Sequence, residues 1–293
     1  MKLHDAVLLV VIYEAAKDYI NDYLASLESQ IYKKFDVLIA NDGYHNFEDH
    51  FSKKGLNWIC IDVKGSISDN RRSLINTAVD KGYKHLIFTD IDDIMADNRI
   101  ESTLNLLDDN PVLVNDLDLI DKNRNIVEKA YLSHRYSNSD LIGLDSLVDG
   151  NIMGLSNTAA RSESIKNSPA LTSGDSIAFD WYLWSSILFE DNKAYFTNAT
   201  KTKYRIYNNN TAGLPQKVDK AYVIKGVKVK FQHYQLMSRL DAAYAHYSDM
   251  YGDLYTQLKD EKICEDYINA LQNNSIDHPV WWENIRLPTE VGL

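Results

Sequence analysis

Three carboxylates stand close together directly behind a short apolar run. The run from Leu86 to Phe88 is followed, after one threonine, by Asp90, Asp92 and Asp93, which we call the acidic triplet. An apolar run that ends in this way is typical of a buried strand, and carboxylates crowded at a strand end repel one another unless a cation holds them. Ligands that offer only oxygen suit Mg²⁺ or Mn²⁺, which leave coordination positions open for a substrate phosphate. The sequence therefore predicts a site for one of these ions at the acidic triplet.

Three further apolar runs of the N-terminal part also end in polar residues. They end at Tyr13-Glu14, at Asp42 and at Asp62. Apolar residues with helical spacing separate the runs, and Ser68 to Asn70 offer a cap for the second of the helices. The expected strands are 7–12, 35–40, 58–61 and 85–88, and the expected helices are 20–31, 70–82 and 100–107.

Strands that alternate with helices are joined as parallel βαβ units. In an open parallel sheet, ligands bind beyond the carboxyl ends of the strands. The four polar strand ends should therefore converge on one acidic crevice. A single acidic residue at a strand end is common in ordinary loops, whereas three within four residues are not.

The composition argues against a nucleic-acid-binding protein and against a membrane-spanning one. The chain has 293 residues, with 31 Lys plus Arg against 42 Asp plus Glu and a net charge of −11, which argues against broad nucleic-acid binding because that needs a basic surface. No stretch approaches the roughly 18 apolar residues of a membrane span, and we interpret the apolar run at the N-terminus as a first strand, not a secretion signal. Two distant cysteines, Cys60 and Cys264, fit a reducing compartment. We therefore expect a cytoplasmic protein.

The chain changes character after about residue 115. Short β-rich pieces appear at 112–114, 117–120, 195–197 and 203–207, with one helical stretch at 177–189 and a mostly helical pattern from 215 onward. We expect one domain of two halves, 1–115 and 116–213, followed by a helical C-terminal extension, 214–293.

One stripe of tyrosines marks the expected extension. Leu240, Tyr244, Tyr247 and Tyr251 recur on one helix face, which we interpret as a packing face. The alternative, which Trp281-Trp282 supports weakly, is peripheral contact with a partner or with the inner face of the cell membrane.

Taken in order, these motifs resemble those of family 2 glycosyltransferases with the Rossmann-like GT-A fold, over about residues 5–213. The opening of that family has a strand, a Tyr-Asn pair, a helix ending near Ser-x-x-x-Gln and a strand ending in Asp-Asp-Gly-Ser. Here Tyr13-Glu14, Ser26 to Gln30 and Asn41 to Tyr44 stand at those places. FTDIDDIMADNRIE is similar to the family's Asp-x-Asp-Asp stretch with its following Arg-hydrophobic-Glu, FDWYLW to its Glu-Asp motif and YRIYNNNTAG to its Tyr-Arg-x-His segment.

The resemblance implies transfer of a sugar from a nucleotide-sugar, with UDP as the favoured nucleotide, to an acceptor hydroxyl with inversion at the anomeric carbon. The product would be a bacterial surface polysaccharide or a similar glycan, built on a glycan or lipid-linked glycan acceptor. The resemblance further implies that Tyr13, Asp42, Arg71 and Asp90 bind the nucleotide-sugar, that the acidic triplet holds Mn²⁺ or Mg²⁺, and that Asp180 is the general base.

The residue types suit this chemistry. A divalent ion neutralises the charge that develops on a diphosphate leaving group, and a carboxylate that takes the proton of the acceptor typically contributes about 10²–10⁴-fold. Asp175 is a competing candidate for the base. Asn41 replaces the first Asp of Asp-Asp-Gly-Ser. Tyr207 stands where a His that can ligate metal often appears, so we expect metal binding that is either weaker or completed by water.

Four residues are candidates for the acceptor side. Asn151 and Gly154 lie in NIMGLSNTAAR, which resembles the family's small-residue stretch leading to the acceptor site, and Arg205 lies in the Tyr-Arg segment. Trp181 offers an aromatic face suited to a sugar ring, although its helical spacing with Trp184 favours core packing. The segment 151–161 is equally compatible with an ordinary loop.

Three other functions compete with sugar transfer. A haloacid-dehalogenase-type phosphatase also has an apolar strand followed by Asp-x-Asp, but that motif normally opens the domain. A nucleotidyltransferase would need a glycine-rich phosphate loop after the first strand, and residues 13–17 contain no glycine. A non-catalytic nucleotide-sugar-binding module is the third alternative, which the retained Asp90, Asp92 and Asp180 argue against.

Overall fold

The computed structural model describes residues 1–52, 55–172, 174–190, 193–206 and 218–293. Its strands are β1 (Ala6–Tyr13), β2 (Phe35–Asp42), β3 (Trp58–Asp62), β4 (His85–Phe88), β5 (Ile94–Met95), β6 (Val112–Ile120), β7 (Ile126–Glu128), β8 (Leu141–Ile142), β9 (Thr158–Arg161) and β10 (Ala194–Arg205). Its α-helices are α1 (Ile20–Ser29), α2 (Glu48–Phe51), α3 (Ile67–Asp80), α4 (Arg99–Leu107), α5 (Ser162–Ile165), α6 (Phe179–Phe189), α7 (Lys220–Met237), α8 (Tyr244–Gln257) and α9 (Glu261–Asn273).

The described strands form one ten-stranded sheet in the order β3-β2-β1-β4-β9-β6-β10-β5, with β7 beside β6 and β8 beside β10. The pairs among β1, β2, β3 and β4 are parallel, and so is the pair β6–β10, whereas β9 runs antiparallel to both of its neighbours. The sheet is therefore mostly parallel, and the expected α/β fold is confirmed.

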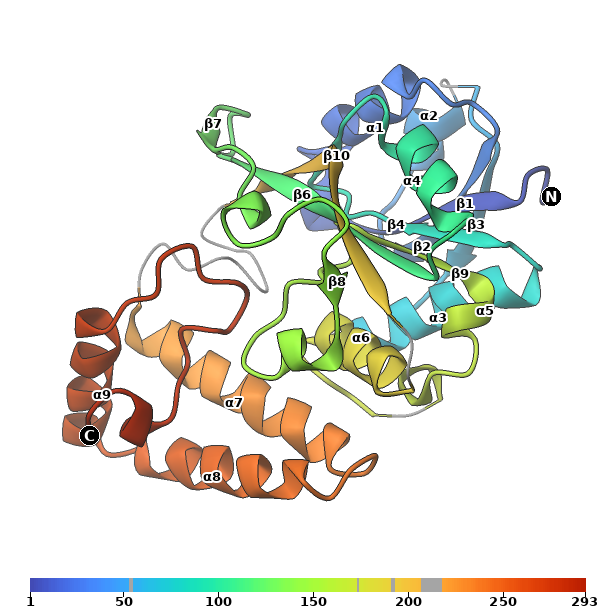
Figure 1. The fold of residues 1–293 in the computed structure, drawn as a ribbon. Coiled ribbons are helices and arrows are strands. Elements are labelled where there is room, and N and C mark those ends of the chain that lie inside the picture. The colour runs from blue at the N-terminus through green and yellow to red at the C-terminus, as the bar shows by residue number, and fades with distance from the viewer. Residues whose placement is uncertain (53–54, 173, 191–192, 207–217) are drawn as a thin grey trace.

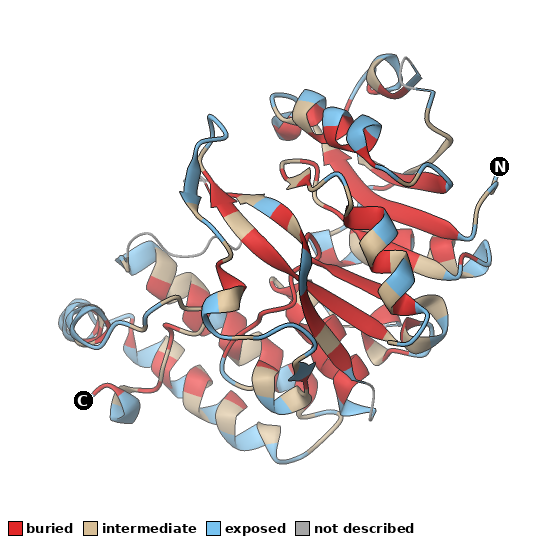
Figure 2. Ribbon diagram, turned by 45° about the horizontal axis from the view of Figure 1, so that its top comes forward, coloured by how far each residue is buried: buried red, intermediate tan, exposed pale blue. Residues whose placement is uncertain are grey.

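Helices cover both faces of the sheet (Figure 1). Successive residues of a strand point to opposite faces, and β1 is buried on both: Leu8, Val10 and Ile12 belong to the apolar cluster that contains α1 and α4, while the alternate residues belong to the cluster that contains α3 and α6. Figure 2 shows the central strands as almost wholly buried. This two-sided burial explains why the strands read as continuous apolar runs in the sequence.

Two pairs of expected short strands are in fact single long strands. Residues 112–120 form β6 without interruption, although Asn115 and Asp116 lie at its centre. Asp116 is fully buried, and it accepts hydrogen bonds from the backbone N–H groups of Leu117 and Leu132 and from the Ser133 hydroxyl. Because these hydrogen bonds compensate for burial of the Asp116 carboxylate, the strand continues through Asn115 and Asp116. Strand β10 likewise spans 194–205, with a register shift between Thr197 and Lys201. The expected division between residues 115 and 116 therefore falls inside β6.

Helix α3 begins earlier than the sequence predicts. Ser66 is its N-cap: the Ser66 hydroxyl accepts from the Asp69 backbone N–H, and the Asp69 carboxylate accepts from the Ser66 backbone N–H. This capping box satisfies two groups that a helix start otherwise leaves unpaired.

Of the C-terminal helices, α7 packs on α6 of the sheet domain, and α8 and α9 pack on α7. Tyr244, Tyr247 and Tyr251 of α8 stack on Tyr234 of α7, so the tyrosine stripe is a packing face. After α9 the chain folds back toward the sheet (Figure 1), where residues 280–282 join the main apolar core. Trp281 and Trp282 are buried there and present no aromatic surface to a membrane. The expected boundary between residues 213 and 214 lies outside the described residues, and within them no helix is long and apolar enough to cross a bilayer.

Candidate active site

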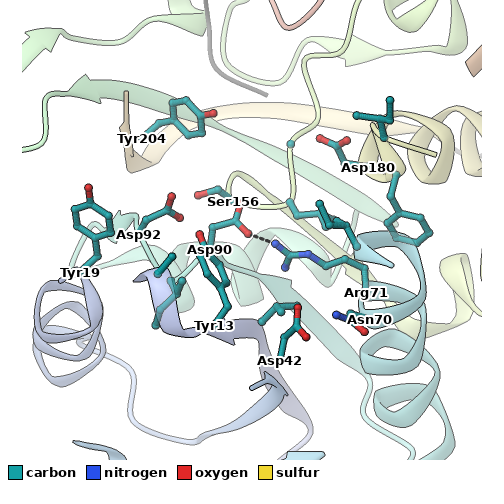
Figure 3. A pocket seen from close by; sticks show the side chains of 18 of the residues that line it. Tyr13, Tyr19, Asp42, Asn70, Arg71, Asp90, Asp92, Ser156, Asp180 and Tyr204 are labelled. Carbon is teal, nitrogen blue, oxygen red and sulfur yellow. Dashed lines mark hydrogen bonds and ion pairs between the residues drawn. The ribbon is translucent and has the colours of Figure 1, made fainter. Parts of the chain in front are cut away.

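A cavity of about 630 Å³ lies at the carboxyl ends of the parallel strands, within the size range of small-molecule sites. Tyr13 ends β1 and Asp42 ends β2, and the two face each other in the parallel register. Asp90 and Asp92 enter from the turn after β4, and Arg71 enters from the second turn of α3 (Figure 3). The structure thus brings these five predicted donor-side residues together at one cavity.

Arg71 and Asp90 form an ion pair on the cavity wall. Both side chains remain partly exposed, at 16% for Arg71 and 25% for Asp90. The pair therefore holds one positive and one negative group at the cavity surface, where each can meet a charged ligand.

Asp93 does not line the cavity, although Asp90 and Asp92 do. Its carboxylate accepts hydrogen bonds from the Ser156 hydroxyl and from the Arg205 backbone N–H. Burial, reinforced by the negative charges of Asp92 and Asp90, raises the pKa of Asp93 well above its usual range. The tight turn from Asp90 to Asp93 directs adjacent side chains apart. Asp93 therefore ties the acidic turn to its neighbours, and we leave it out of the proposed metal ligands.

Asp180 lies at the start of α6, across the cavity from Tyr13 and Asp42 (Figure 3). Burial raises the pKa of Asp180 to about 6; the charge of Asp90 acts in the same direction, while the Trp181 backbone N–H and the charge of Arg71 oppose it. Such a carboxyl group is ionised at neutral pH yet basic enough to accept a proton, which suits a general base.

The competing base candidate lies elsewhere. Asp175 is exposed, accepts a hydrogen bond from the Ser66 hydroxyl at 3.1 Å and does not line the cavity. Of the two aspartates, only Asp180 is placed to meet a ligand in the cavity.

Of the four acceptor-side candidates, only Gly154 lines the cavity. Trp181 is fully buried, donates from its indole nitrogen to the Leu147 carbonyl and stacks on His233 with ring centroids 3.9 Å apart, so it is a core residue. Asn151 is buried, and its side-chain amide donates to the Asp180 carboxylate at 3.0 Å. It positions that carboxylate and does not itself face a ligand.

Arg205 is a structural residue, contrary to the expected acceptor role. Its side chain is fully buried, and its guanidinium donates to the Asp92 carbonyl at 2.7 Å and to the Asp22 carboxylate at 2.9 Å. It also lies over the Tyr19 ring, 4.7 Å from the centroid. Its charge is thus used to hold the acidic turn against α1. Tyr207, expected next to it in place of a metal-ligating His, lies outside the described residues.

Trp281 belongs to the site, although no motif of the sequence places it there. Trp281 lines the cavity from the C-terminal segment, where its backbone pairs with Asn151, and its indole nitrogen donates to the Tyr204 hydroxyl at 3.3 Å. The two rings meet edge to face at 5.3 Å. Because 77 residues separate Tyr204 from Trp281, no local pattern connects them, and the Trp-Trp pair was the sole available signal.

Asp90 and Asp92 are the residues that fit a divalent ion at this cavity. Both offer carboxylate oxygens to it, and both keep some exposure. Two carboxylates on an open wall suit Mg²⁺ or Mn²⁺, which commonly use one or two protein carboxylates together with water and substrate phosphate.

Comparison with known proteins identifies the fold. No protein-family model and no curated protein matches the chain. Among solved structures, residues 1–349 of S. aureus TarS in complex with UDP-GlcNAc match with a TM-score of 0.58 and 15% identity over 86% of this chain and 71% of that one. The complex of TarS with UDP matches with a TM-score of 0.57 and 14% identity over 86% and 70%.

A second protein has a similar fold. The mannosyltransferase PcManGT from Pyrobaculum calidifontis, in complex with GDP-Man and Mn²⁺, matches with a TM-score of 0.54 and 15% identity over 80% of this chain and 64% of that one. At these identities the likeness establishes the fold alone.

Proposed function

We propose that this protein is a metal-dependent, inverting glycosyltransferase that uses a nucleotide-sugar donor. The observation that carries the proposal is the arrangement of one cavity: Asp90 and Asp92 lie on one wall, and Asp180, whose pKa is raised to about 6, lies on the other. The fold supports it, because proteins of the same fold have been solved with UDP-GlcNAc and with GDP-Man and Mn²⁺. We further propose UDP as the nucleotide and a glycan or lipid-linked glycan of a bacterial surface polysaccharide as the acceptor.

In this proposal, residues on one wall of the cavity bind the donor and a residue on the opposite wall acts on the acceptor. Tyr13 and Asp42 contact the nucleoside, and Arg71 supplies positive charge beside the diphosphate. A divalent ion held by Asp90 and Asp92 would neutralise the charge that develops on the phosphate oxygens as the diphosphate leaves.

On the opposite wall, Asp180 takes the proton of the acceptor hydroxyl as its oxygen attacks the anomeric carbon. Attack from the side opposite the leaving diphosphate is one displacement and inverts the anomeric configuration. Asn151 holds the Asp180 carboxylate toward the cavity through its 3.0 Å hydrogen bond.

The phosphatase alternative loses its support in this fold. It needs the acidic motif at the end of the strand that opens the domain, whereas the acidic triplet follows β4. Asn41 departs from the family pattern, which is compatible with a non-catalytic binding module. Its side chain accepts a hydrogen bond from the Tyr44 backbone N–H and donates one to the Asp62 carboxylate. It shapes the turn after β2, so its identity does not argue against catalysis.

The proposal is tested by donor binding and turnover. UDP-, GDP-, dTDP- and CMP-sugars are screened for thermal stabilisation with and without Mn²⁺, and hydrolysis and transfer are measured with the donor that binds. We expect Asp92→Asn to abolish metal-dependent turnover and Asp175→Asn, a matched exposed aspartate outside the cavity, to leave it unchanged. Unchanged turnover in Asp92→Asn would refute the metal role, and donor binding without turnover in the wild type would favour the binding module.

A further inference from the structure

Two histidines and one glutamate converge at a place remote in sequence from the acidic triplet. The Nε2 atoms of His134 and His278 lie 3.1 and 2.8 Å from the same carboxylate oxygen of Glu128. The two imidazole rings are stacked, with centroids 3.9 Å apart and an interplanar angle of 21°. One potential ligand atom from each residue therefore lies within 4.8 Å of the others.

The ligand chemistry of this cluster differs from that of the cavity. Two imidazole nitrogens and one carboxylate oxygen form a set that zinc uses in proteins, with water in the fourth position. Bonds of about 2.0–2.1 Å to a tetrahedral ion place the ligand atoms roughly 3.3 Å apart. The two nitrogen–oxygen distances are slightly shorter than this. An ion lies in the plane of each imidazole that binds it, so binding would also turn the two rings out of their stacked arrangement. The side chains are 30–45% exposed and have room to turn.

The cluster joins two parts of the chain. Glu128 ends β7 and His134 ends the short 3₁₀ helix η3 (Leu132–His134), whereas His278 belongs to the segment that follows α9. His278 has a φ of 50°, in the left-handed region that histidine adopts more readily than most residues. A ligand that binds all three residues would fix this backbone conformation.

Neighbouring contacts hold the same segment on the same surface. The Tyr131 hydroxyl donates to the Pro279 carbonyl at 2.8 Å, and Arg135 forms a two-contact ion pair with Glu283. Trp281, which lines the cavity, lies between these attachments. The cluster is thus the first of several links that seat the segment carrying Trp281.

We propose that Glu128, His134 and His278 bind a zinc ion that fastens the C-terminal segment to the sheet domain, at a site separate from the cavity. The site does not depend on the function proposed above, because its residues do not line the cavity. Its nitrogen ligands favour a transition metal such as zinc over Mg²⁺, whereas the all-oxygen wall at Asp90 and Asp92 suits Mg²⁺ or Mn²⁺.

Isothermal titration of the full chain with Zn²⁺ tests the site. The protein is first stripped of metal, and saturating Mg²⁺ is present to fill the oxygen site. We expect one equivalent of Zn²⁺ to bind with micromolar or tighter affinity, to raise the melting temperature, and to show nitrogen and oxygen ligands by X-ray absorption at the zinc edge.

Matched variants locate the ion. His134→Ala and His278→Ala should each weaken Zn²⁺ binding at least tenfold and remove the thermal shift. If a histidine variant fails to fold, Glu128→Gln replaces it, because glutamine keeps the shape of the side chain, and it should weaken Zn²⁺ binding in the same way. His246→Ala, on the exposed face of α8, and Asp92→Asn should bind Zn²⁺ like the wild type. The site is overturned if the wild type binds no Zn²⁺ or if His278→Ala binds it equally well.

Discussion

At the scale of single residues, the environment of each carboxyl group decides its role. Asp90, Asp92 and Asp180 are all half-buried. Asp180 differs in that burial raises its pKa to about 6 and Asn151 donates a hydrogen bond to it, whereas Asp90 is paired with Arg71. When carboxyl groups of one site have different surroundings, one of them can accept a proton while the others bind positive charge. Asp180 is accordingly the residue whose protonation should control turnover.

The pH dependence of turnover tests that assignment. Because the pKa of Asp180 is raised to about 6, the base is protonated below that pH and ionised above it. We expect kcat/KM to rise about tenfold per pH unit below pH 6 and to level off above it, since kcat/KM reports the free enzyme. Asp180→Asn should lower turnover by about 10²–10⁴-fold while UDP binding is retained. A flat profile from pH 5 to 8 would remove Asp180 from the role of base.

Asn151 provides a second test at this scale. Its amide donates to the Asp180 carboxylate, and a hydrogen bond to the charged form lowers a pKa. We expect Asn151→Ala to shift the acid limb of the kcat/KM profile to higher pH, so that the loss is larger at pH 6 than at pH 8. A loss that is equal at all pH values would instead indicate general structural damage.

The positions of site residues, as distinct from their roles, were predictable from sequence where a side chain ends a strand. Tyr13, Asp42 and Asp90 follow buried runs directly, and the parallel sheet gathers such positions at one edge. Asp93 and Arg205 were misjudged because the turn at 90–93 sends adjacent carboxylates in different directions. A motif gives residue types in order, but it does not give the directions of their side chains.

At the scale of elements, buried side chains of the C-terminal segment pack directly on the backbone of α7. A Cβ added at Gly226 of α7 would lie 2.5 Å from Ile285 Cγ1 and 3.4 Å from Trp282 Cε3. Ile285 is fully buried and has no room to move away. The helix can therefore meet this segment because residue 226 has no side chain.

Gly226→Ala should consequently destabilise the protein. In an exposed helix, replacing glycine by alanine gains about 1 kcal/mol, but overpacking here should cost about 1–3 kcal/mol and exceed that gain. We expect a lower melting temperature by calorimetry. Gly252→Ala on α8, where the nearest atom is a Phe231 ring carbon at 3.1 Å, should have a smaller effect. A Gly226→Ala variant more stable than the wild type would contradict the close packing.

Strands and helices were predictable from sequence where the apolar residues follow a single regular spacing. The strands and helices of residues 6–107 follow continuous apolar runs and amphipathic faces, and β4 was predicted to the residue. The long strands β6 and β10 were divided because buried polar residues and a register shift interrupt their apolar pattern. The partners that compensate for these interruptions, such as Ser133 for Asp116, come from other parts of the chain.

At the scale of the whole molecule, the C-terminal extension is part of the main fold. Val280, Trp281 and Trp282 belong to the same apolar core as α3 and α6, and Trp282 stacks on Tyr222 of α7. The sequence predicted a helical extension over 214–293 but not its contact with the sheet domain, because the three buried residues 280–282 stand among polar residues.

Unfolding should therefore be cooperative across the chain. We expect tryptophan fluorescence and far-UV circular dichroism to report one coincident transition in urea. Trp282→Ala should lower the free energy of unfolding by about 3–5 kcal/mol and shift both signals together. Two separate transitions in the wild type would show that the extension folds independently.

In the function proposed above, Asp90 and Asp92 hold a divalent ion against the diphosphate of a nucleotide. The most direct measurement is the anomalous scattering of manganese from crystals grown with Mn²⁺ and UDP. We expect one manganese peak within about 2.5 Å of carboxylate oxygens of Asp90 and Asp92, bridged to the phosphates of UDP. UDP bound in the cavity with manganese elsewhere, or with none, would contradict it.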